Sequence, residues 1–233
     1  MRFGAQYGGA TTCSYYQTTF SLTENPLGEG GRWISRDANR TRIQTTGGNA
    51  FGTQAGTGAF DDSYAYLSGV WRPDTEIITT LFKTGSPFGS IEQEHLHRCS
   101  DTTSTCVGYE VFTNHDGGWL DFVRWTGPSD ELSDFVYLVP AGTYSVSGGI
   151  SNGYKFRSTC TTGVNGRAEL NAYIDRNDSN GWILINGSVV VDSAGAGGSA
   201  VLPSGSPGIG AYRGSSSGDN TTFGASDYQV TQL

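Results

Sequence analysis

The chain has 233 residues with a formal net charge of −8, and only 15% of its residues are charged. This balance argues against broad nucleic-acid binding, which needs Lys and Arg to neutralise phosphates, and against an intrinsically disordered chain. No apolar run approaches about 18 residues and the two lysines lie far apart, so the sequence predicts neither a bilayer span nor a polybasic membrane anchor.

The first segment, residues 1–19, is expected to form an N-terminal arm ahead of a single domain over residues 20–233. Residues 1–16 contain Arg2 but no apolar stretch of the kind a secretory signal needs, so they are expected to be mature sequence. A β-sandwich commonly runs to roughly 200–250 residues as one unit, which fits this length.

Beyond the arm, short segments alternate polar and apolar residues and end at turn-forming residues, which is the pattern of strands joined by turns. The predicted strands are residues 77–82, 90–98, 108–113, 119–125, 134–139, 143–146, 167–174, 181–185 and 188–191, with a final strand within 223–230. Two hairpins are expected, at residues 115–118 and at Asn186-Gly187, a dipeptide that favours tight hairpins. The sequence therefore predicts an all-β sandwich or barrel.

The four cysteines suggest disulfides. Cys99 and Cys106 flank a short polar segment that a disulfide would close, and Cys13 and Cys160 would then form a long-range pair. Three pairings are open to four cysteines, and four reduced thiols are the alternative. No C-x-x-C pair exists, which argues against zinc. Disulfides without an export signal favour an extracellular or virion protein.

The order of several motifs resembles concanavalin A-like lectin and glucanase domains, particularly the laminin-G-like domains of bacterial and phage proteins. The motifs are Asn25-Pro26-Leu27, Gly30-Gly31-Arg32-Trp33, Asp62-Ser63-Tyr64-Ala65-Tyr66, Gly108-Tyr109-Glu110, Val123-Arg124-Trp125-Thr126-Gly127, Trp182-Ile183-Leu184-Ile185-Asn186-Gly187, Ser206-Pro207-Gly208-Ile209-Gly210 and Thr222-Phe223-Gly224. The resemblance covers residues 20–230 and implies a jelly-roll sandwich of two curved antiparallel sheets, often with a carbohydrate site on the concave face. Such a fold hosts both binding and cleavage, so function must come from the site.

The segment over residues 91–98 is the first candidate site. In a strand, its alternate residues would share faces: Glu92, Glu94, Leu96 and Arg98 on one, and Ile91, Gln93, His95 and His97 on the other. Glu92 and Glu94 have the spacing of a glycosidase carboxyl pair. The resembling glucanases carry a further carboxylate on this strand, where Leu96 stands here. A salt-bridged strand edge is the alternative.

Histidines in the same segment give a second candidate. Gln93-Glu94-His95 matches the Gln-x-His strand of alginate-lyase-like members of the fold, in which the histidine acts as the general base. The Arg-rich and Tyr-containing strands of those enzymes are not recognisable here. His95 and His97 could hold a metal only with a third ligand from elsewhere, and polar groove-lining residues are the alternative.

Aromatic rings on neighbouring predicted strands give the third candidate. Flat surfaces for sugar rings are offered by Tyr109, Trp119, Trp125, Tyr137 and Tyr144. Asp121 shares the face of the two tryptophans, and core packing is the alternative. The candidate ligand-binding set is Gln93, His97, Tyr109, Trp119, Asp121 and Trp125.

Metal binding has little support in the sequence. Asp61-Asp62 and Asp219-Asn220 offer oxygens for calcium, but no EF-hand spacing accompanies them, so we expect solvated turns and no cofactor. Incomplete catalytic sets favour a non-catalytic module that binds a polysaccharide or glycan. The alternatives are a polysaccharide-cleaving hydrolase or lyase using Glu92, Glu94 or His95, and a structural virion protein that binds other subunits.

Overall fold

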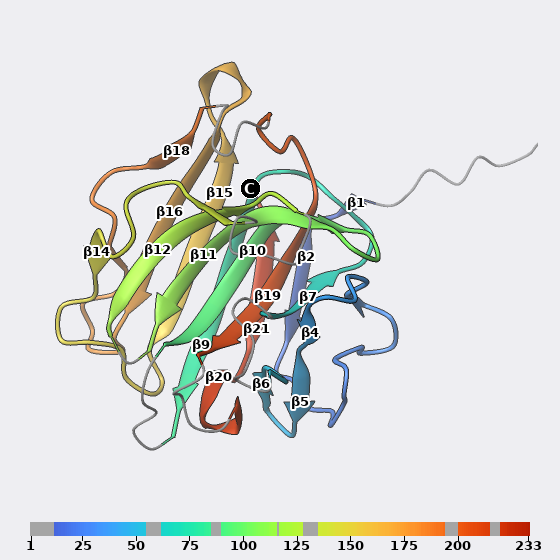
Figure 1. Cartoon of the computed structure of the whole chain (residues 1–233). Coiled ribbons are helices and arrows are strands. Elements are labelled where there is room, and N and C mark those ends of the chain that lie inside the picture. The colour runs from blue at the N-terminus through green and yellow to red at the C-terminus, as the bar shows by residue number, and fades with distance from the viewer. Residues whose placement is uncertain are drawn as a thin grey trace, which may run out of the picture.

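Two large sheets stack face to face and make up most of the molecule (Figure 1). The computed structural model describes residues 12–54, 62–84, 90–115, 117–127, 135–193, 200–214 and 220–233. Helix is confined there to two short 3-10 turns, η2 (Val164–Gly166) and η4 (Asn220–Thr222). A helix capable of crossing a bilayer is absent from this described part of the chain.

The front sheet holds the strands in which the sequence placed its candidate residues. Its order is β13 (Phe135–Tyr137), β12 (Trp119–Trp125), β11 (Cys106–Asn114), β10 (Ile91–Asp101), β19 (Ser206–Arg213), β7 (Ser63–Leu67) and β3 (Trp33–Ile34), with β14 (Tyr144–Ser145) beside β12 and β4 (Thr41–Arg42) beside β7. The ladders from β13 to β3 are antiparallel, and β4 runs parallel to β7.

The back sheet covers one face of the front sheet. Its order is β17 (Ile183–Leu184), β16 (Ala168–Asp175), β15 (Lys155–Thr162), β9 (Thr75–Lys83), β20 (Phe223–Ala225), β6 (Asn49–Phe51) and β5 (Gln44–Thr46), with β18 (Val190–Asp192) beside β16 and β21 (Tyr228–Gln232) between β9 and β2 (Tyr15–Thr18). A parallel pair, β1 (Thr12–Cys13) and β8 (Val70–Trp71), adds a small third sheet. Residues 12–18 of the expected N-terminal arm therefore pair with the rest of the domain.

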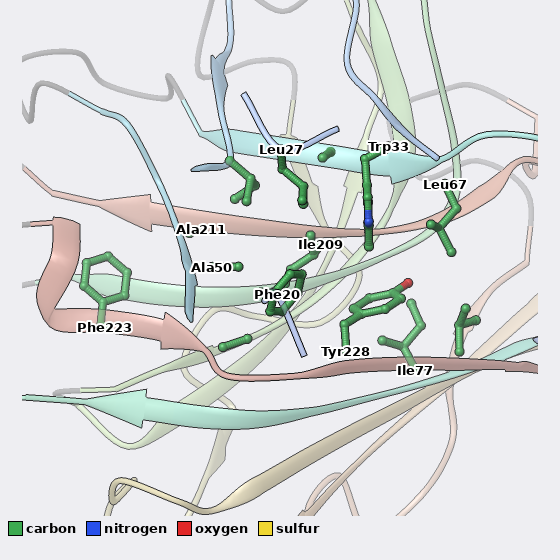
Figure 2. Close-up of a cluster of buried hydrophobic side chains, with 14 of the residues drawn as sticks. Phe20, Leu27, Trp33, Ala50, Leu67, Ile77, Ile209, Ala211, Phe223 and Tyr228 are labelled. Atoms are coloured by element: carbon green, nitrogen blue, oxygen red, sulfur yellow. The ribbon is translucent and has the colours of Figure 1, made fainter. Parts of the chain in front are cut away.

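The core between the sheets divides into two apolar clusters. The first surrounds Trp33, whose ring meets that of Tyr228 edge to face with centroids 5.0 Å apart, beside Ile77 and Ile209 (Figure 2). The second packs side chains of β11 and β12, such as Phe122, against those of β15 and β16. Rings supply much of this buried area, which explains how a chain with 36% hydrophobic residues fills a sandwich.

The strand predictions agree with the structure in part. β12 has the predicted bounds, and the predicted hairpin at 115–118 joins β11 to β12; of its residues, Asp116 lies outside the described ones. The final segment forms two strands, β20 and β21, and β15 and β19 were not predicted.

The hairpin predicted at Asn186-Gly187 is wrong. β17 and β18 do not pair with each other; both pair with β16, one after the other along the same edge. Between them the Asn186 side chain bonds to that edge, accepting from the Ala172 N–H at 3.2 Å and donating to the Leu170 carbonyl at 3.4 Å. Because the amide side chain takes over ladder hydrogen bonds, the chain continues past this point without reversing.

Candidate functional site

The outer face of the front sheet, which points away from the back sheet, carries acidic side chains on its central strands. On β10, Glu94 lies opposite Phe112 of β11 and Gly210 of β19. Two residues further along β10, and on the same face, Leu96 lies opposite Glu110. Because paired residues project to the same face, Glu94 and Glu110 lie side by side, with Glu92 next to Glu94 on the same side of β10.

A pocket of about 360 Å³ opens on this face. Its lining mixes carboxyl groups with apolar and aromatic side chains: Asp62, Glu92, Glu110, Phe112, Val123, Phe135, Tyr137 and Tyr212. Tyr137 is 47% exposed, whereas Glu110 and Phe112 are buried. The pocket therefore offers aromatic surface near solvent and carboxyl groups at depth, a mixture typical of small-molecule sites.

Two of the lining residues, Glu92 and Glu110, form a carboxyl cluster with the buried Glu94, which lies beside them. One oxygen from each lies within 4.8 Å of the others. Glu94 is fully buried, and neither of its carboxyl oxygens has a hydrogen-bond partner in the structure. A Cβ atom on Gly210 would come within 2.0 Å of Glu94 Oε2, so glycine at this position leaves the space that the carboxyl group occupies.

Burial raises the pKa of all three carboxyl groups. The pKa of Glu110 rises to about 8, first because of desolvation and then because of the nearby Asp62 charge. The Trp125 indole, which donates to Glu110 Oε2 at 2.5 Å, works in the opposite direction. The pKa values of Glu92 and Glu94 also lie well above the usual range, because of desolvation and then the neighbouring Glu110. Charge in this cluster is therefore costly unless something compensates for it.

A buried arginine lies close to the cluster. Arg40 forms an ion pair with Asp62 at 2.8 Å, and its guanidinium stacks over the Trp125 ring at 3.8 Å from the ring centroid. Its charge also lowers the pKa values of Glu94 and Glu110, but desolvation outweighs this effect, so the carboxyl groups are compensated only in part.

The predicted aromatic residues occupy different places. Trp125 is buried beneath Arg40 on the outer face, and Trp119 packs edge to face on Phe112 of the pocket lining. Tyr109 points the other way, into the core, where its hydroxyl donates to Asp192 at 2.8 Å. Asp121 lies opposite Phe112 on the outer face and accepts hydrogen bonds from the Gly142 N–H at 2.9 and 3.0 Å. Burial raises its pKa to about 6.

The predicted histidines lie on the opposite face of β10, between the sheets. His95 contacts the hydroxyls of Thr79 and Ser158 at 2.9 Å each. His97 contacts Thr75 at 2.8 Å and the same Ser158 hydroxyl at 2.7 Å. Both are fully buried, and desolvation lowers both pKa values, that of His97 to about 3. They are neutral bridges between the sheets rather than pocket residues.

Two further members of the predicted strand are also turned inward or displaced. Gln93 is buried and donates to the Gly210 carbonyl at 2.9 Å. Arg98 was expected on the face of Glu92 and Glu94, and this is wrong. A bulge follows His97, and Arg98 adopts a φ of 52°, which turns its side chain toward the Leu202 carbonyl at 2.8 Å and Thr162 at 2.9 Å.

The expected disulfides do not form, and all four cysteines are free. The Sγ atoms of Cys99 and Cys106 lie 3.7 Å apart, far beyond a bonded distance of about 2.05 Å. The bulge on β10 shifts the register so that Cys106 pairs with Asp101 and not with Cys99. Cys160 packs in the second core cluster and Cys13 against the first, so they belong to different parts of the interior.

Of the calcium candidates named from the sequence, two lie outside the described residues and two make other contacts. Asp61 and Asp219 fall outside the described residues, and Asp62 pairs with Arg40. The Asn220 amide donates to the Gln54 carbonyl at 2.6 Å.

Sequence reasoning missed the residues that complete the pocket, above all Glu110 and Tyr212. Glu110 is an acidic residue within a strand of mostly apolar neighbours, and this anomaly was a usable signal. Its position beside Glu94 depends on the pairing of β10 with β11, which only the structure supplies. Tyr212 belongs to β19, which was not predicted as a strand.

Comparison with solved structures supports the architecture. The carbohydrate binding module CBM66 from Bacillus subtilis is similar over 89% of this chain and 96% of its own, at 11% identity and a TM-score of 0.52. The lumenal domain of VIP36 with Ca²⁺ and Man2 bound (10% identity, 90% and 85% coverage, TM-score 0.48) and the alginate lyase PA1167 from Pseudomonas aeruginosa (12%, 82% and 86%, 0.39) also match. No protein-family model and no curated protein sequence matches the chain.

The chain has the concanavalin A-like jelly-roll fold. This confirms the predicted fold class of two curved antiparallel sheets. At 11% identity the likeness concerns the fold alone, and it transfers no ligand and no residue role.

Proposed function

We propose that the chain binds a carbohydrate in the outer-face pocket and does not cleave it. The observation that carries the proposal is the lining of the pocket, which combines the exposed Tyr137, and Tyr212 opposite Glu92 on β19, with the carboxyl groups of Glu92 and Glu110. Aromatic rings provide flat apolar surface for the C–H face of a sugar, and carboxyl groups fix its hydroxyls. The similar Bacillus subtilis protein is itself a carbohydrate binding module, which supports the proposal.

The charge of the pocket narrows the ligand class. The lining contributes Asp62, Glu92 and Glu110, and the nearby Arg40 is paired with Asp62. Burial already makes negative charge on Glu92 and Glu110 costly, and an acidic sugar would place its own charge in the same surroundings, which is unfavourable. The expected ligand is therefore a neutral or amino sugar, presented by a short glycan segment that a pocket of about 360 Å³ can hold.

Replacing the tyrosines tests the site. We expect Tyr137→Ala and Tyr212→Ala each to weaken glycan affinity about tenfold, because stacking on a ring contributes on the order of 1 kcal/mol. Tyr15→Ala, which removes an exposed tyrosine from β2, should leave affinity unchanged. Screening on a glycan array followed by calorimetry measures all three. Failure of the native chain to bind any neutral or amino-sugar glycan would exclude the proposal, as would equal losses in all three variants.

Hydrolysis of the bound glycan is a second candidate, favoured by the pKa of Glu110. A carboxyl group with a pKa of about 8 is protonated at neutral pH, as a general acid must be, and Glu92 lies beside it. We expect any release of reducing sugar to vanish in Glu110→Gln while glycan binding stays within about threefold. Glu169→Gln, on the back sheet, is the matched control. His95 is buried on the other face of β10, so we propose no lyase activity.

A further inference from the structure

The carboxyl cluster poses a problem that carbohydrate binding does not solve. Three glutamates lie together at the pocket, yet Glu94 has no hydrogen-bond partner for either oxygen. A buried carboxylate without a partner is strongly unfavourable, so the group either takes up a proton or is paired with a cation. Arg40 is close enough to lower the pKa of Glu94, but it forms its ion pair with Asp62 and no hydrogen bond to Glu94.

We propose that Glu92, Glu94 and Glu110 bind one calcium ion at the outer-face pocket. The inference goes beyond the proposed function and does not depend on it. Calcium takes oxygen ligands at about 2.3–2.6 Å, so oxygens around one ion lie up to roughly 4.6–5.2 Å apart. The three carboxyl oxygens, within 4.8 Å of one another, fit that sphere. Magnesium, with ligands at about 2.0–2.1 Å, requires a tighter set.

The chemistry of the ligands, their access to solvent and their hydrogen bonds all suit a calcium ion. The three side chains offer carboxyl oxygens and no sulfur or imidazole nitrogen, which favours a hard cation over zinc. Two of the ligands, Glu92 and Glu110, line the pocket and give the ion an entry path from solvent. Asn114 hydrogen-bonds to Glu92 and Trp125 donates to Glu110, so two of the ligands are already oriented.

Glycine at position 210 is the second sign of a built site. It lies directly opposite Glu94 on the neighbouring strand, and a methyl group there would overlap the carboxyl group. Glycine weakens a strand, because it has no side chain to pack and loses more conformational entropy on folding. Its presence opposite Glu94 therefore indicates that space is needed there. The carboxyl group of Glu94 occupies that space.

Calcium binding to the full chain tests the proposal directly, without any glycan. The chain is freed of metal with a chelator at pH 7.5 and titrated with CaCl₂ by calorimetry, and terbium is added in parallel as a luminescent substitute. We expect one calcium ion per chain and terbium emission sensitised by Trp125, whose indole contacts the Glu110 ligand. We also expect calcium to raise the Tm by at least about 3 °C, because it binds the folded state alone.

Two variants assign the ligands. Glu94→Gln keeps the shape but removes a charge, and should weaken calcium binding at least about tenfold. Gly210→Ala keeps all three carboxyl groups and should weaken it by displacing Glu94. The matched controls are Glu169→Gln, and Gly28→Ala, whose added methyl group would meet nothing nearer than 3.9 Å; both should bind calcium normally.

The outcomes are distinct from those of the glycan experiments. Absence of calcium and terbium binding to the folded native chain at millimolar concentration overturns the inference and shows that protons alone neutralise the cluster. Normal calcium binding in folded Glu94→Gln overturns it as well. Glycan binding is measured in the presence of chelator, so its outcome does not depend on the calcium titrations.

Discussion

In the presence of a chelator, we expect the free energy of unfolding to fall by about 2 kcal/mol as the pH rises from 6.5 to 8, on account of Glu110 alone. Its folded pKa of about 8 lies far above that of an unfolded glutamate. The folded state therefore binds more protons than the unfolded state, and stability is lost as the pH rises toward the folded pKa. Glu92 and Glu94, whose pKa values are also raised, act in the same direction.

The buried histidines act in the opposite direction. Burial lowers the pKa values of His95, His97 and His115, the latter two to about 3. Such groups oppose the carboxyl groups, because the unfolded histidines are half protonated at about pH 6.5 while the folded ones stay neutral. The three together raise the free energy of unfolding by about 1 kcal/mol between pH 6.5 and 8. The contribution of Glu110 is therefore read from the difference between the native chain and a Glu110 variant, in which the histidine contribution cancels.

Denaturant unfolding at pH 6.5 and pH 8 measures the effect. Glu110→Gln should flatten the profile by about 2 kcal/mol, and Glu169→Gln should not. Added calcium should reverse the slope, since a bound cation favours ionised ligands. Identical slopes for the native chain and Glu110→Gln in chelator would contradict the raised pKa of Glu110.

The second large effect concerns the ion pair between Arg124 of β12 and Asp192 of β18. The two are 2.8 Å apart and almost fully buried, and Asp192 also accepts from Tyr109. We expect Arg124→Met to lower the free energy of unfolding by about 3–5 kcal/mol, because it leaves a buried carboxylate without its counter-charge.

A second arginine offers a matched control. Arg157 pairs with Glu76 at 2.6 Å, but both side chains are partly exposed. Arg157→Met should therefore cost only about 1 kcal/mol or less. Chemical denaturation of the two variants beside the native chain provides the comparison; equal losses would show that burial does not set the strength of these pairs.

The sequence predicted which face of the sheet a side chain lies on better than it predicted which residues lie beside it. Strict alternation along β10 correctly separated Glu92 and Glu94 from Gln93, His95 and His97. The separation failed at Arg98, where a residue with positive φ breaks the alternation. A bulge of this kind depends on the tertiary setting and leaves no pattern in the local sequence.

Part of the candidate site could be predicted from the sequence, namely the residues that lie on a single strand. Glu92 and Glu94 were identified from one strand, but their partner Glu110 comes from the next, and strand register is a long-range property. β19 escaped prediction because Gly208 and Gly210 interrupt its apolar pattern. Gly210 also leaves the space that the Glu94 carboxyl group occupies, so one of the residues that hide the strand contributes to the site.

The two buried histidines have a consequence for the movement of protons. Ser158 carries a single hydroxyl proton yet contacts both His95 and His97, so it donates to one ring and accepts from the other. Each neutral ring likewise has one donor and one acceptor, and threonine hydroxyls end the row at Thr75 and Thr79. In this row of five groups, all hydrogen bonds therefore donate in the same direction, either from Thr75 toward Thr79 or the reverse. A change of tautomer in one histidine requires the same change in the other.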